Sequence, residues 1–444
     1  MLKWTVQKII NQLIKSHQIP LKSSGISMEP IFHENDVLYF KKIAFKSIKV
    51  NDIVSIKKGK QLISHRVIYK TNKYLVTKGD NNPISDGKIF PKQIIGKVYQ
   101  VKRKGQIFDP EQLYLLQSTL YFQEIVKIKT KLDKQGINYV FLKGLPLHLY
   151  FEKTHPRRIY LDCDVLVDKK DFFKAEKILI KNGYRRYNQS LSKIHTFLRK
   201  KQIELPFYKT INGFSVVFDV HLDIDWMFQQ LGRLEEFYPQ KFIDQLTVDF
   251  LRTKRKVKIN NEFFFILDTK YLILYLALHI FHHNFRGAFR YEFLNKVIKY
   301  SAPHSTKIHP GTKIHPGGVI WADLTIRTND FKLNNFIYPV FVLLKKYYQT
   351  PIPKSFFTTI QPFNNVAMKQ WNNVNIFDDE PRVHAGITRF TNLFVLSPNP
   401  LWKRLLILLN LQVIYSVFWV VAKKIDQILS TSFTMKLKPR SNSL

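Results

Sequence analysis

The chain contains one cysteine, Cys163, among its 444 residues. A lone cysteine excludes an intramolecular disulfide and a zinc site built from several thiolates. This exclusion favours a reducing compartment, and we therefore expect a cytoplasmic protein. No secretory signal is expected either, because Lys3, Lys8 and Lys15 interrupt residues 1–21. The apolar side chains of that segment recur at helical spacing, which predicts an amphipathic helix.

Acidic side chains are scarce as well, with 33 Asp and Glu against 70 Lys and Arg and a formal net charge of +37. Such an excess favours anionic partners, so nucleic acid, nucleotides and acidic lipid surfaces are not excluded. The basic residues are scattered and form no single block, so a solvated basic surface is the alternative interpretation. No RNA- or DNA-binding motif accompanies them, and a nucleic-acid partner therefore rests on charge alone.

The order of predicted elements divides the chain into three parts. A length of 444 residues exceeds what one hydrophobic core usually supports. Short β-branched segments between turn residues predict an all-β domain over 1–106, ended by a charged hinge at 102–111. Strands and helices then alternate over 107–260, which predicts an α/β or α+β domain. The remainder, 261–444, is expected to be a helical region that begins with a helical pattern over 262–300.

Three features of the C-terminal region allow more than one structural interpretation. The hexamer Thr-Lys-Ile-His-Pro-Gly occurs twice over 306–317, and two copies are too few for a solenoid, so we expect a duplicated loop. Residues 405–422 are almost wholly apolar, which suits a buried or membrane-surface helix, with a true span as the alternative. The histidines His279, His282 and His283 have metal-ligand spacing, but no carboxylate completes the set and a packing role is favoured.

The most specific motif lies in the first domain. Ser27 belongs to the segment Ser-Gly-Ile-Ser-Met-Glu-Pro, and His65 to Ile-Ser-His-Arg-Val on a predicted strand. Asp80 and Asp86 follow on a segment rich in turn residues. An attacking serine needs an exposed turn, backbone amides that hold the oxyanion, and a general base. These residues therefore predict nucleophilic chemistry, with a turn serine beside a solvent-exposed histidine as the alternative.

The order and spacing of these blocks resemble signal peptidase I, in the archaeal and endoplasmic-reticulum form where histidine replaces the bacterial lysine. The resemblance covers roughly residues 20–105 and implies a signal-peptidase-like (LexA-like) β fold with serine endopeptidase activity. It implies that Ser27 is the nucleophile and His65 the base. Asp86 would orient the histidine, with Asp80 as the rival for that role.

Two departures from the signal peptidase pattern affect what the resemblance implies. The family usually has a serine where this chain has Gly25, so an oxyanion donor would come from Ser24 or the backbone. The family also usually begins with a membrane-spanning helix, which residues 1–21 do not predict. This second departure favours cytoplasmic peptides over exported proteins as substrates.

Acidic side chains gather on two predicted strands of the second domain. Strand alternation places Asp162 and Asp164 on one face and Cys163 on the other, where we expect it in the core. Asp219 lies on the polar face of the segment 214–224. Carboxylates on neighbouring strands can bind Mg²⁺, which orients a nucleoside triphosphate. A solvated acidic edge is the alternative interpretation.

The residues around these carboxylates add a second resemblance. The segment Phe-Leu-Lys-Gly, which ends in Lys143 and Gly144, precedes them, and a Gly-Tyr pair follows the next predicted helix. This order resembles a poorly characterised group of the nucleotidyltransferase superfamily over about residues 110–300. The resemblance implies Mg²⁺ as cofactor, a nucleoside triphosphate as substrate, and Lys143 and Gly144 beside its phosphates. The metal ligands it implies are Asp162, Asp164 and Asp219. One departure is that Leu-Lys-Gly stands where the superfamily commonly has Gly-Ser.

Together the two resemblances predict a bifunctional enzyme. One domain would cleave a peptide or protein, and the other would transfer a nucleotidyl group to an unknown acceptor on the same side of any membrane. A first alternative is a signal peptidase anchored to the membrane through 405–422, with a degenerate second domain. A second alternative is a non-catalytic adaptor that binds peptide or nucleic acid.

Overall fold

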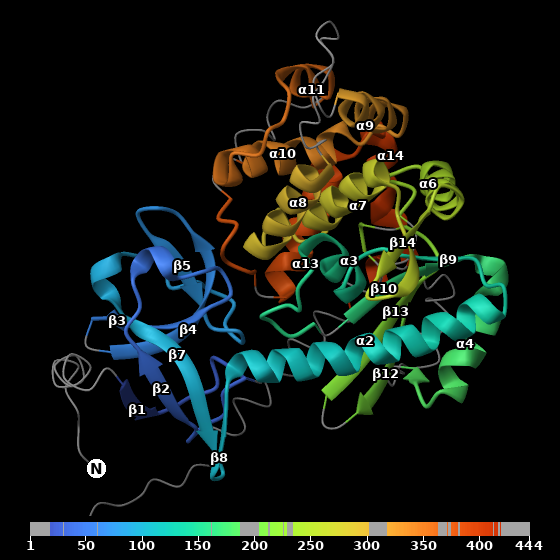
Figure 1. Cartoon of the computed structure of the whole chain (residues 1–444). Helices are drawn as coiled ribbons and strands as arrows, with labels where there is room; N and C mark the ends of the chain where they lie inside the picture. The colour runs from blue at the N-terminus through green and yellow to red at the C-terminus, as the bar shows by residue number, and fades with distance from the viewer. Residues whose placement is uncertain are drawn as a thin grey trace, which may run out of the picture.

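Two β-sheets and a layer of helices make up the described part of the chain, and a long helix, α2, leads from the first sheet to the second (Figure 1). The structure is a computed structural model. It describes residues 18–29, 31–59, 61–160, 162–186, 204–211, 214–224, 226–228, 234–301, 318–362, 371, 374–380, 382–411, 413–415 and 418.

The first sheet is antiparallel, with the order β1-β2-β7-β3-β4-β5-β6 and β8 beside β7. Its strands are β1 (Gln18–Lys22), β2 (Val37–Lys41), β3 (Ile53–Lys58), β4 (Gln61–Lys70), β5 (Leu75–Lys78), β6 (Lys88–Ile89), β7 (Ile94–Arg103) and β8 (Gln106–Phe108). Short 3-10 helices lie at Phe45–Ser47 and Pro91–Gln93. The β-branched side chains of Val54, Ile56 and Val67, on β3 and β4, are fully buried. The predicted β-rich N-terminal region is confirmed.

Two local predictions in this region are wrong. Residues 18–21 belong to strand β1 rather than to a helix, and β1 pairs only with β2 at the edge of the sheet. Pro20 suits an edge strand, where its missing N–H removes no ladder hydrogen bond, and it opposes a helix. The charged segment expected as a hinge is a hairpin, in which Lys104 and Gly105 turn β7 into β8 with φ of 47° and 85°.

The second sheet is mixed and has the order β11-β12-β13-β10-β9-β15-β14. Its strands are β9 (Tyr139–Phe141), β10 (Asp162–Val167), β11 (Arg185–Arg186), β12 (Glu204–Ile211), β13 (Phe214–His221), β14 (Arg255–Ile259) and β15 (Glu262–Ile266). The pairs β10–β13 and β9–β15 are parallel. Helix α2 (Pro110–Lys134) packs on the sheet, and Tyr121 Oη donates to Val217 O at 2.7 Å. The predicted α/β architecture is confirmed.

Helices form most of the rest of the described chain. They are α3 (Leu145–Glu152), α4 (Phe172–Lys181), α6 (Gln240–Arg252), α7 (Thr269–His282), α8 (Ala288–Ser301), α9 (Gly318–Asp330), α10 (Asn334–Tyr348), α11 (Lys354–Thr359), α13 (Arg382–Leu396) and α14 (Leu401–Leu405), with 3-10 helices η3 (Lys169–Asp171) and η4 (Leu406–Leu409). Their fully buried apolar side chains continue the core of the second sheet. The helical C-terminal region is confirmed.

The helical pattern predicted over 262–300 is wrong at its start, because Glu262–Ile266 form strand β15. Asn260 and Asn261, with φ of 46° and 69°, make a two-residue turn between β14 and β15. Asparagine tolerates positive φ, so a pair of asparagines favours a hairpin turn. The prediction missed this turn because the residues after it are apolar and fit a helical pattern.

The segment 374–380 connects the helical region to the first sheet. Asp378 Oδ1 accepts hydrogen bonds from Ser85 N at 2.8 Å and from Ser85 Oγ at 2.6 Å. On another side of the first sheet, Arg66 Nη1 donates to Arg157 O at 2.8 Å. The two sheets are therefore joined by polar contacts besides α2, and Figure 1 shows them next to each other.

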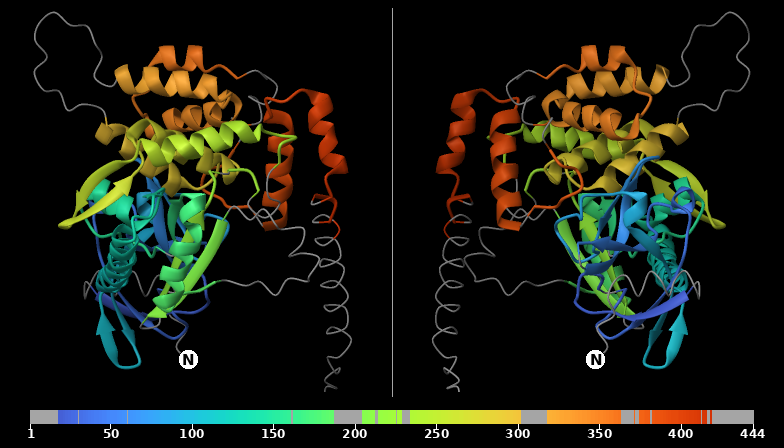
Figure 2. Two further views of the ribbon diagram at one scale, coloured as in Figure 1. Left: turned by 90° about the vertical axis from the view of Figure 1, so that its right-hand side faces the viewer. Right: turned by 90° about the vertical axis from the view of Figure 1, so that its left-hand side faces the viewer.

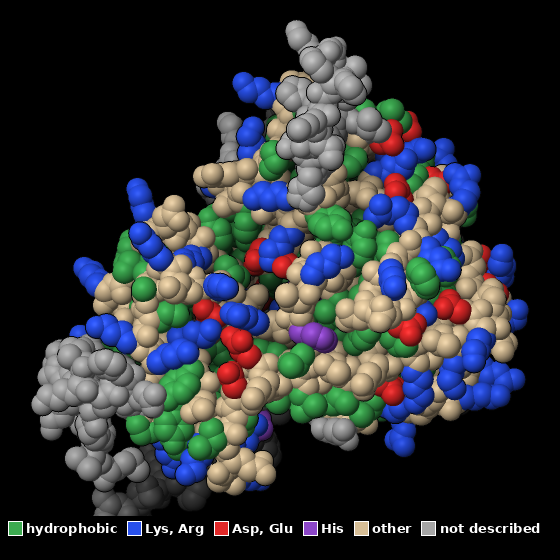
Figure 3. Space-filling model, viewed as in Figure 1, with side chains coloured by type: hydrophobic (Ala, Val, Ile, Leu, Met, Phe, Trp, Pro, Cys, Tyr) green, Lys and Arg blue, Asp and Glu red, His purple; other side chains and the backbone are tan. Residues whose placement is uncertain are grey.

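Three sequence features remain partly or wholly outside the described residues. Residues 1–17 and the repeated hexamers at 306–317 lie outside them, and 405–422 is described only in part. Among the described residues, no helix combines the length and the hydrophobicity that a bilayer crossing requires. Lys and Arg side chains are spread over the face shown in Figure 3, in agreement with their scattered positions in the sequence.

Candidate active sites

Ser27, His65 and Asp86 lie in a continuous hydrogen-bonded chain. His65 Nδ1 is 2.7 Å from Asp86 Oδ2, and His65 Nε2 is 3.0 Å from Ser27 Oγ. Because an ionised carboxylate can only accept, Nδ1 carries the proton and Nε2 accepts from the serine hydroxyl. The chain of contacts has the order nucleophile, base and orienting carboxylate that activated serines require.

The loop between β5 and β6 holds two members of this triad in place. It carries Asp86, and its Asn81 N donates to Ser27 O at 2.8 Å, while His65 comes from β4. Gly79 touches the same turn, since a Cβ at this position would lie 2.6 Å from Ser27 O. The turn residues of this loop thus support the backbone of the serine.

The two candidate orienting carboxylates have different partners. Burial alone would raise the pKa of Asp86, but hydrogen bonds from His65 and Thr77 outweigh burial and lower it. Thr77 Oγ1 donates to Asp86 Oδ2 at 2.7 Å. Asp80 instead receives two hydrogen bonds from Arg66, each of 2.6 Å. Asp86 is therefore the carboxylate on the histidine, and Asp80 is held away from it.

The three predicted acidic residues meet on neighbouring strands. Asp162 and Asp164 lie on β10, and Asp164 is in parallel register with Asp219 on β13. Oxygen atoms of the three carboxylates lie within 4.8 Å of one another. Cys163 points the other way and is fully buried, as the alternation predicts. Three clustered carboxylates are a donor set that fits a hard divalent cation such as Mg²⁺.

The Lys143–Gly144 turn closes one side of this acidic cluster. Lys143 Nζ lies 2.8 Å from Asp164 Oδ2 and 3.4 Å from Asp162 Oδ2. Gly144 caps α3 with φ of 99°, and a Cβ there would lie 3.1 Å from Asp162 O. The glycine therefore allows the turn to approach the start of β10 closely.

Two residues that the sequence did not single out as site residues complete the cluster. His221 Nε2 lies 3.0 Å from Asp164 Oδ1, and both side chains are buried. Glu204 is the register partner of His221 on β12, and burial raises its pKa. Alternation placed His221 on the polar face of its strand, whereas nothing near Glu204 indicated that β12 adjoins the site.

The pKa of Asp219 predicts pH-dependent metal binding. Burial, followed by the Asp164 and Glu204 carboxylates, raises this pKa to about 8, so Asp219 is protonated at neutral pH without a metal. A divalent cation must displace that proton, so we expect Mg²⁺ affinity to rise from about pH 6.5 to about pH 8.5. Calorimetry in two buffers of different ionisation heat counts the released protons. Asp219→Asn should lose the release, and an unchanged release in this variant would contradict the assignment.

The three histidines of α7 pack against one another. The rings of His279 and His283 are 4.8 Å apart, and those of His282 and His283 are 5.1 Å apart. His282 Nδ1 also lies 3.1 Å from Trp226 O. Burial lowers the pKa of all three well below the usual value, so they are neutral. These contacts agree with the packing role that the sequence favoured.

Comparison with known protein families gives a match over the segment that contains the acidic cluster. Residues 108–297 match the family described as "Uncharacterised nucleotidyltransferase". This segment is a nucleotidyltransferase-like domain. It contains β9, β10, β13 and the acidic cluster of Asp162, Asp164 and Asp219. The match begins at residue 108, and the comparisons give no support to a signal peptidase assignment for the residues before it.

Two solved structures are similar to the chain at low identity. One is an antigenic nucleotidyltransferase-like protein from Paracoccidioides brasiliensis, with 14% identity, 50% of this chain and 90% of that chain covered, and a TM-score of 0.28. The other is antibiotic-resistance factor ANT(2'')-Ia, with 14% identity, 42% of this chain and 85% of that chain covered, and a TM-score of 0.27. Both TM-scores are too low to support any statement about this chain. No match was found among curated proteins.

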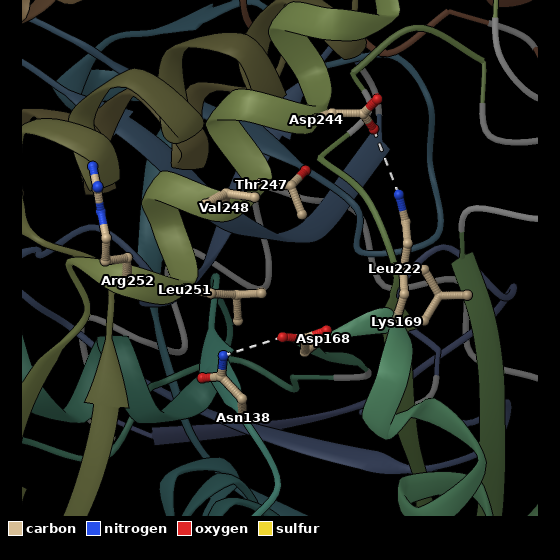
Figure 4. Close-up of a pocket in the computed structure, with 9 residues that line it drawn as sticks. All are labelled: Asn138, Asp168, Lys169, Leu222, Asp244, Thr247, Val248, Leu251 and Arg252. Carbon is tan, nitrogen blue, oxygen red and sulfur yellow. Dashed lines mark hydrogen bonds and ion pairs between the residues drawn. The ribbon is translucent and has the colours of Figure 1, made fainter.

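A pocket at the other end of β10 is separate from the nucleotidyltransferase site. It lies between α6 and the turn after β10, where Lys169 Nζ contacts Asp244 Oδ1 at 3.5 Å (Figure 4). Asp168, which lines it, follows the last residue of β10, whereas Asp162 is the first. The pocket contains none of the predicted site residues, and we assign it no chemistry.

Proposed function

We propose that the chain is a bifunctional enzyme, in which a metal-dependent nucleotidyltransferase is joined to a serine endopeptidase of the signal peptidase type. The observation that carries the first activity is the cluster of three carboxylates inside the matched nucleotidyltransferase segment. The observation that carries the second is the hydrogen-bonded chain of Ser27, His65 and Asp86.

In the nucleotidyltransferase, Asp162, Asp164 and Asp219 would hold Mg²⁺. When bound, such an ion would orient the triphosphate and stabilise the charge that develops on the α-phosphate and on the pyrophosphate leaving group. Lys143 carries a positive charge between the carboxylates and would contact the phosphates. His221 holds the buried Asp164 carboxylate in position at 3.0 Å.

The test of transfer uses the full-length chain, Mg²⁺ and each nucleoside triphosphate labelled at the α- or the γ-phosphate. A cell extract supplies acceptors, because the acceptor is unidentified. Label should enter a product from the α-position and not from the γ-position, with release of pyrophosphate. Label transferred from the γ-position would instead indicate a kinase and contradict the proposal.

In the peptidase, His65 Nε2 would remove the proton of Ser27 while the oxygen attacks the peptide carbonyl. Asp86 would hold the Nδ1 proton and stabilise the imidazolium that forms. The oxyanion donor would come from Ser24 or from the backbone, because Gly25 has no hydroxyl. Cytoplasmic peptides or proteins are the proposed substrates, and cleavage confined to exported proteins would contradict that location.

A second proposal concerns the membrane surface. Large apolar side chains of α14, η4 and the residues after them are at least 44% exposed: Leu401, Trp402, Leu405, Leu406, Leu408, Leu409, Leu411, Ile414 and Phe418. The segment lies on the outer side of the helical region (Figure 2), and Lys403 and Arg404 lie within it. Exposed apolar side chains next to cations suit the surface of an anionic bilayer.

Vesicle binding tests this contact. We expect the chain to sediment with vesicles that contain phosphatidylglycerol and much less with pure phosphatidylcholine. Leu408→Asp with Leu409→Asp should lower this binding about tenfold, since both leucines lose their favourable transfer into the interface. Ile326→Asp, at an exposed position of α9, is the control. Binding that the double variant leaves intact would refute the contact, as would self-association through this segment.

A further inference from the structure

Two arginines stack on one phenylalanine near the acidic cluster. Arg158 Cζ lies 4.5 Å and Arg290 Cζ 4.4 Å from the centre of the Phe289 ring. Phe289 belongs to α8 and is 42% exposed. Two guanidinium groups on one ring repel each other, and their proximity therefore requires a compensating interaction.

Within the described part of the chain, the Asp379 and Asp162 carboxylates stabilise the charge of Arg290, but neither forms an ion pair with it. The neighbouring arginines Arg157 and Arg286 pair with carboxylates at 2.9 and 3.2 Å, whereas among the described residues Arg158 and Arg290 form no ion pair. Arg290 Nε and Nη1 are buried without a hydrogen-bond partner. Burial lowers the pKa of Arg290 to about 10, although the Asp379 carboxylate opposes this shift. A buried donor group without an acceptor is costly, which points to an anionic ligand.

The position of the stack relates it to the nucleotidyltransferase site. Arg158 lies four residues before Asp162, at which β10 begins. The negative charge of Asp162 raises the pKa of Arg290. The positive charges of Lys143 and Arg290 both lower the pKa of His279. The Arg290 charge is thus close enough to the charges of Asp162 and Lys143 to interact with them.

We propose that Arg158 and Arg290 bind the triphosphate of the nucleotide substrate. This inference rests on the proposed nucleotidyltransferase function and names the part of the substrate that these side chains recognise. A planar guanidinium presents paired N–H donors that match two phosphate oxygens. Stacking on Phe289 holds each guanidinium plane, so little freedom remains to be lost when the phosphates bind.

The test is a calorimetric titration of the full-length chain with inorganic tripolyphosphate, with and without Mg²⁺. Arg158→Gln and Arg290→Gln should each weaken binding about tenfold, and the double variant about a hundredfold. Arg290→Lys keeps the charge and should bind between wild type and Arg290→Gln, which separates charge from folding. Arg327→Gln is the matched control, because the ion pair of that arginine, 3.8 Å long, is with Asp330 of its own helix.

The outcomes separate this inference from the proposed function. If the double variant binds tripolyphosphate as wild type does, or wild type does not bind it, the arginine assignment is wrong even if α-label is still transferred. If binding depends on the arginines but wild type transfers no α-label, the anion site stands and the proposed transfer fails. Weakened binding together with α-label transfer supports both.

Discussion

Asp164→Asn is expected to lower the rate of α-label transfer by about three orders of magnitude, a loss typical of removing one preorganised charge from a catalytic site. Asp164 is 2% exposed, and its oxygens contact Lys143 at 2.8 Å and His221 at 3.0 Å. An amide in its place removes the negative charge that Lys143 and a metal require. The initial rate of transfer at saturating Mg²⁺ and nucleotide measures the effect.

An exposed carboxylate provides the control for this variant. Asp330 ends α9, and its side chain is 53% exposed, so Asp330→Asn should transfer at the wild-type rate. Thermal unfolding of both variants distinguishes a lost ligand from a lost fold. Transfer by a folded Asp164→Asn protein within a few-fold of wild type would mean that the acidic cluster is not the reaction centre.

Ser27→Ala should abolish peptide cleavage, with a loss of about 10⁴-fold or more, because the attacking oxygen is removed. The His65–Asp86 hydrogen bond of 2.7 Å does not involve the serine, so the variant should remain folded. Cleavage is followed by mass spectrometry of a peptide library. A fluorophosphonate probe, which reacts with activated serines, should label wild type and not the variant.

Ser47→Ala is the matched control for the nucleophile. Ser47 lies in a 3-10 helix of the same sheet region and is exposed, so its loss should change neither cleavage nor labelling. Asp86→Asn should also reduce cleavage, since His65 would lose the acceptor that fixes its tautomer. A Ser27→Ala protein that retains the biological function of wild type would favour the adaptor interpretation.

Strand periodicity predicted the acidic cluster because that cluster depends on local alternation. Asp162 and Asp164 share a face for that reason alone, and the register with Asp219 then follows from parallel pairing. The triad needed more than periodicity. Motif resemblance placed Ser27 and His65, while the choice of Asp86 over Asp80 depended on the partner of Arg66, a long-range contact.

Features that depend on contacts between distant residues could not be predicted. Glu204 reaches the acidic cluster only because β12 pairs with β13. The stack of Arg158, Phe289 and Arg290 joins the turn before β10 to α8. The helix predicted over residues 1–21 also fails at residues 18–21, which pair with β2 as an edge strand.

The central claim is that Asp162, Asp164 and Asp219 form a divalent-metal site, and titration with Mn²⁺ followed by electron paramagnetic resonance tests it most directly. Wild type and Asp330→Asn should remove free Mn²⁺ from solution with the same affinity at about pH 8, where Asp219 is about half ionised. Asp162→Asn combined with Asp164→Asn should lose this binding. If the double variant, shown to be folded, retains wild-type Mn²⁺ affinity, the carboxylates do not hold the metal and the account is wrong.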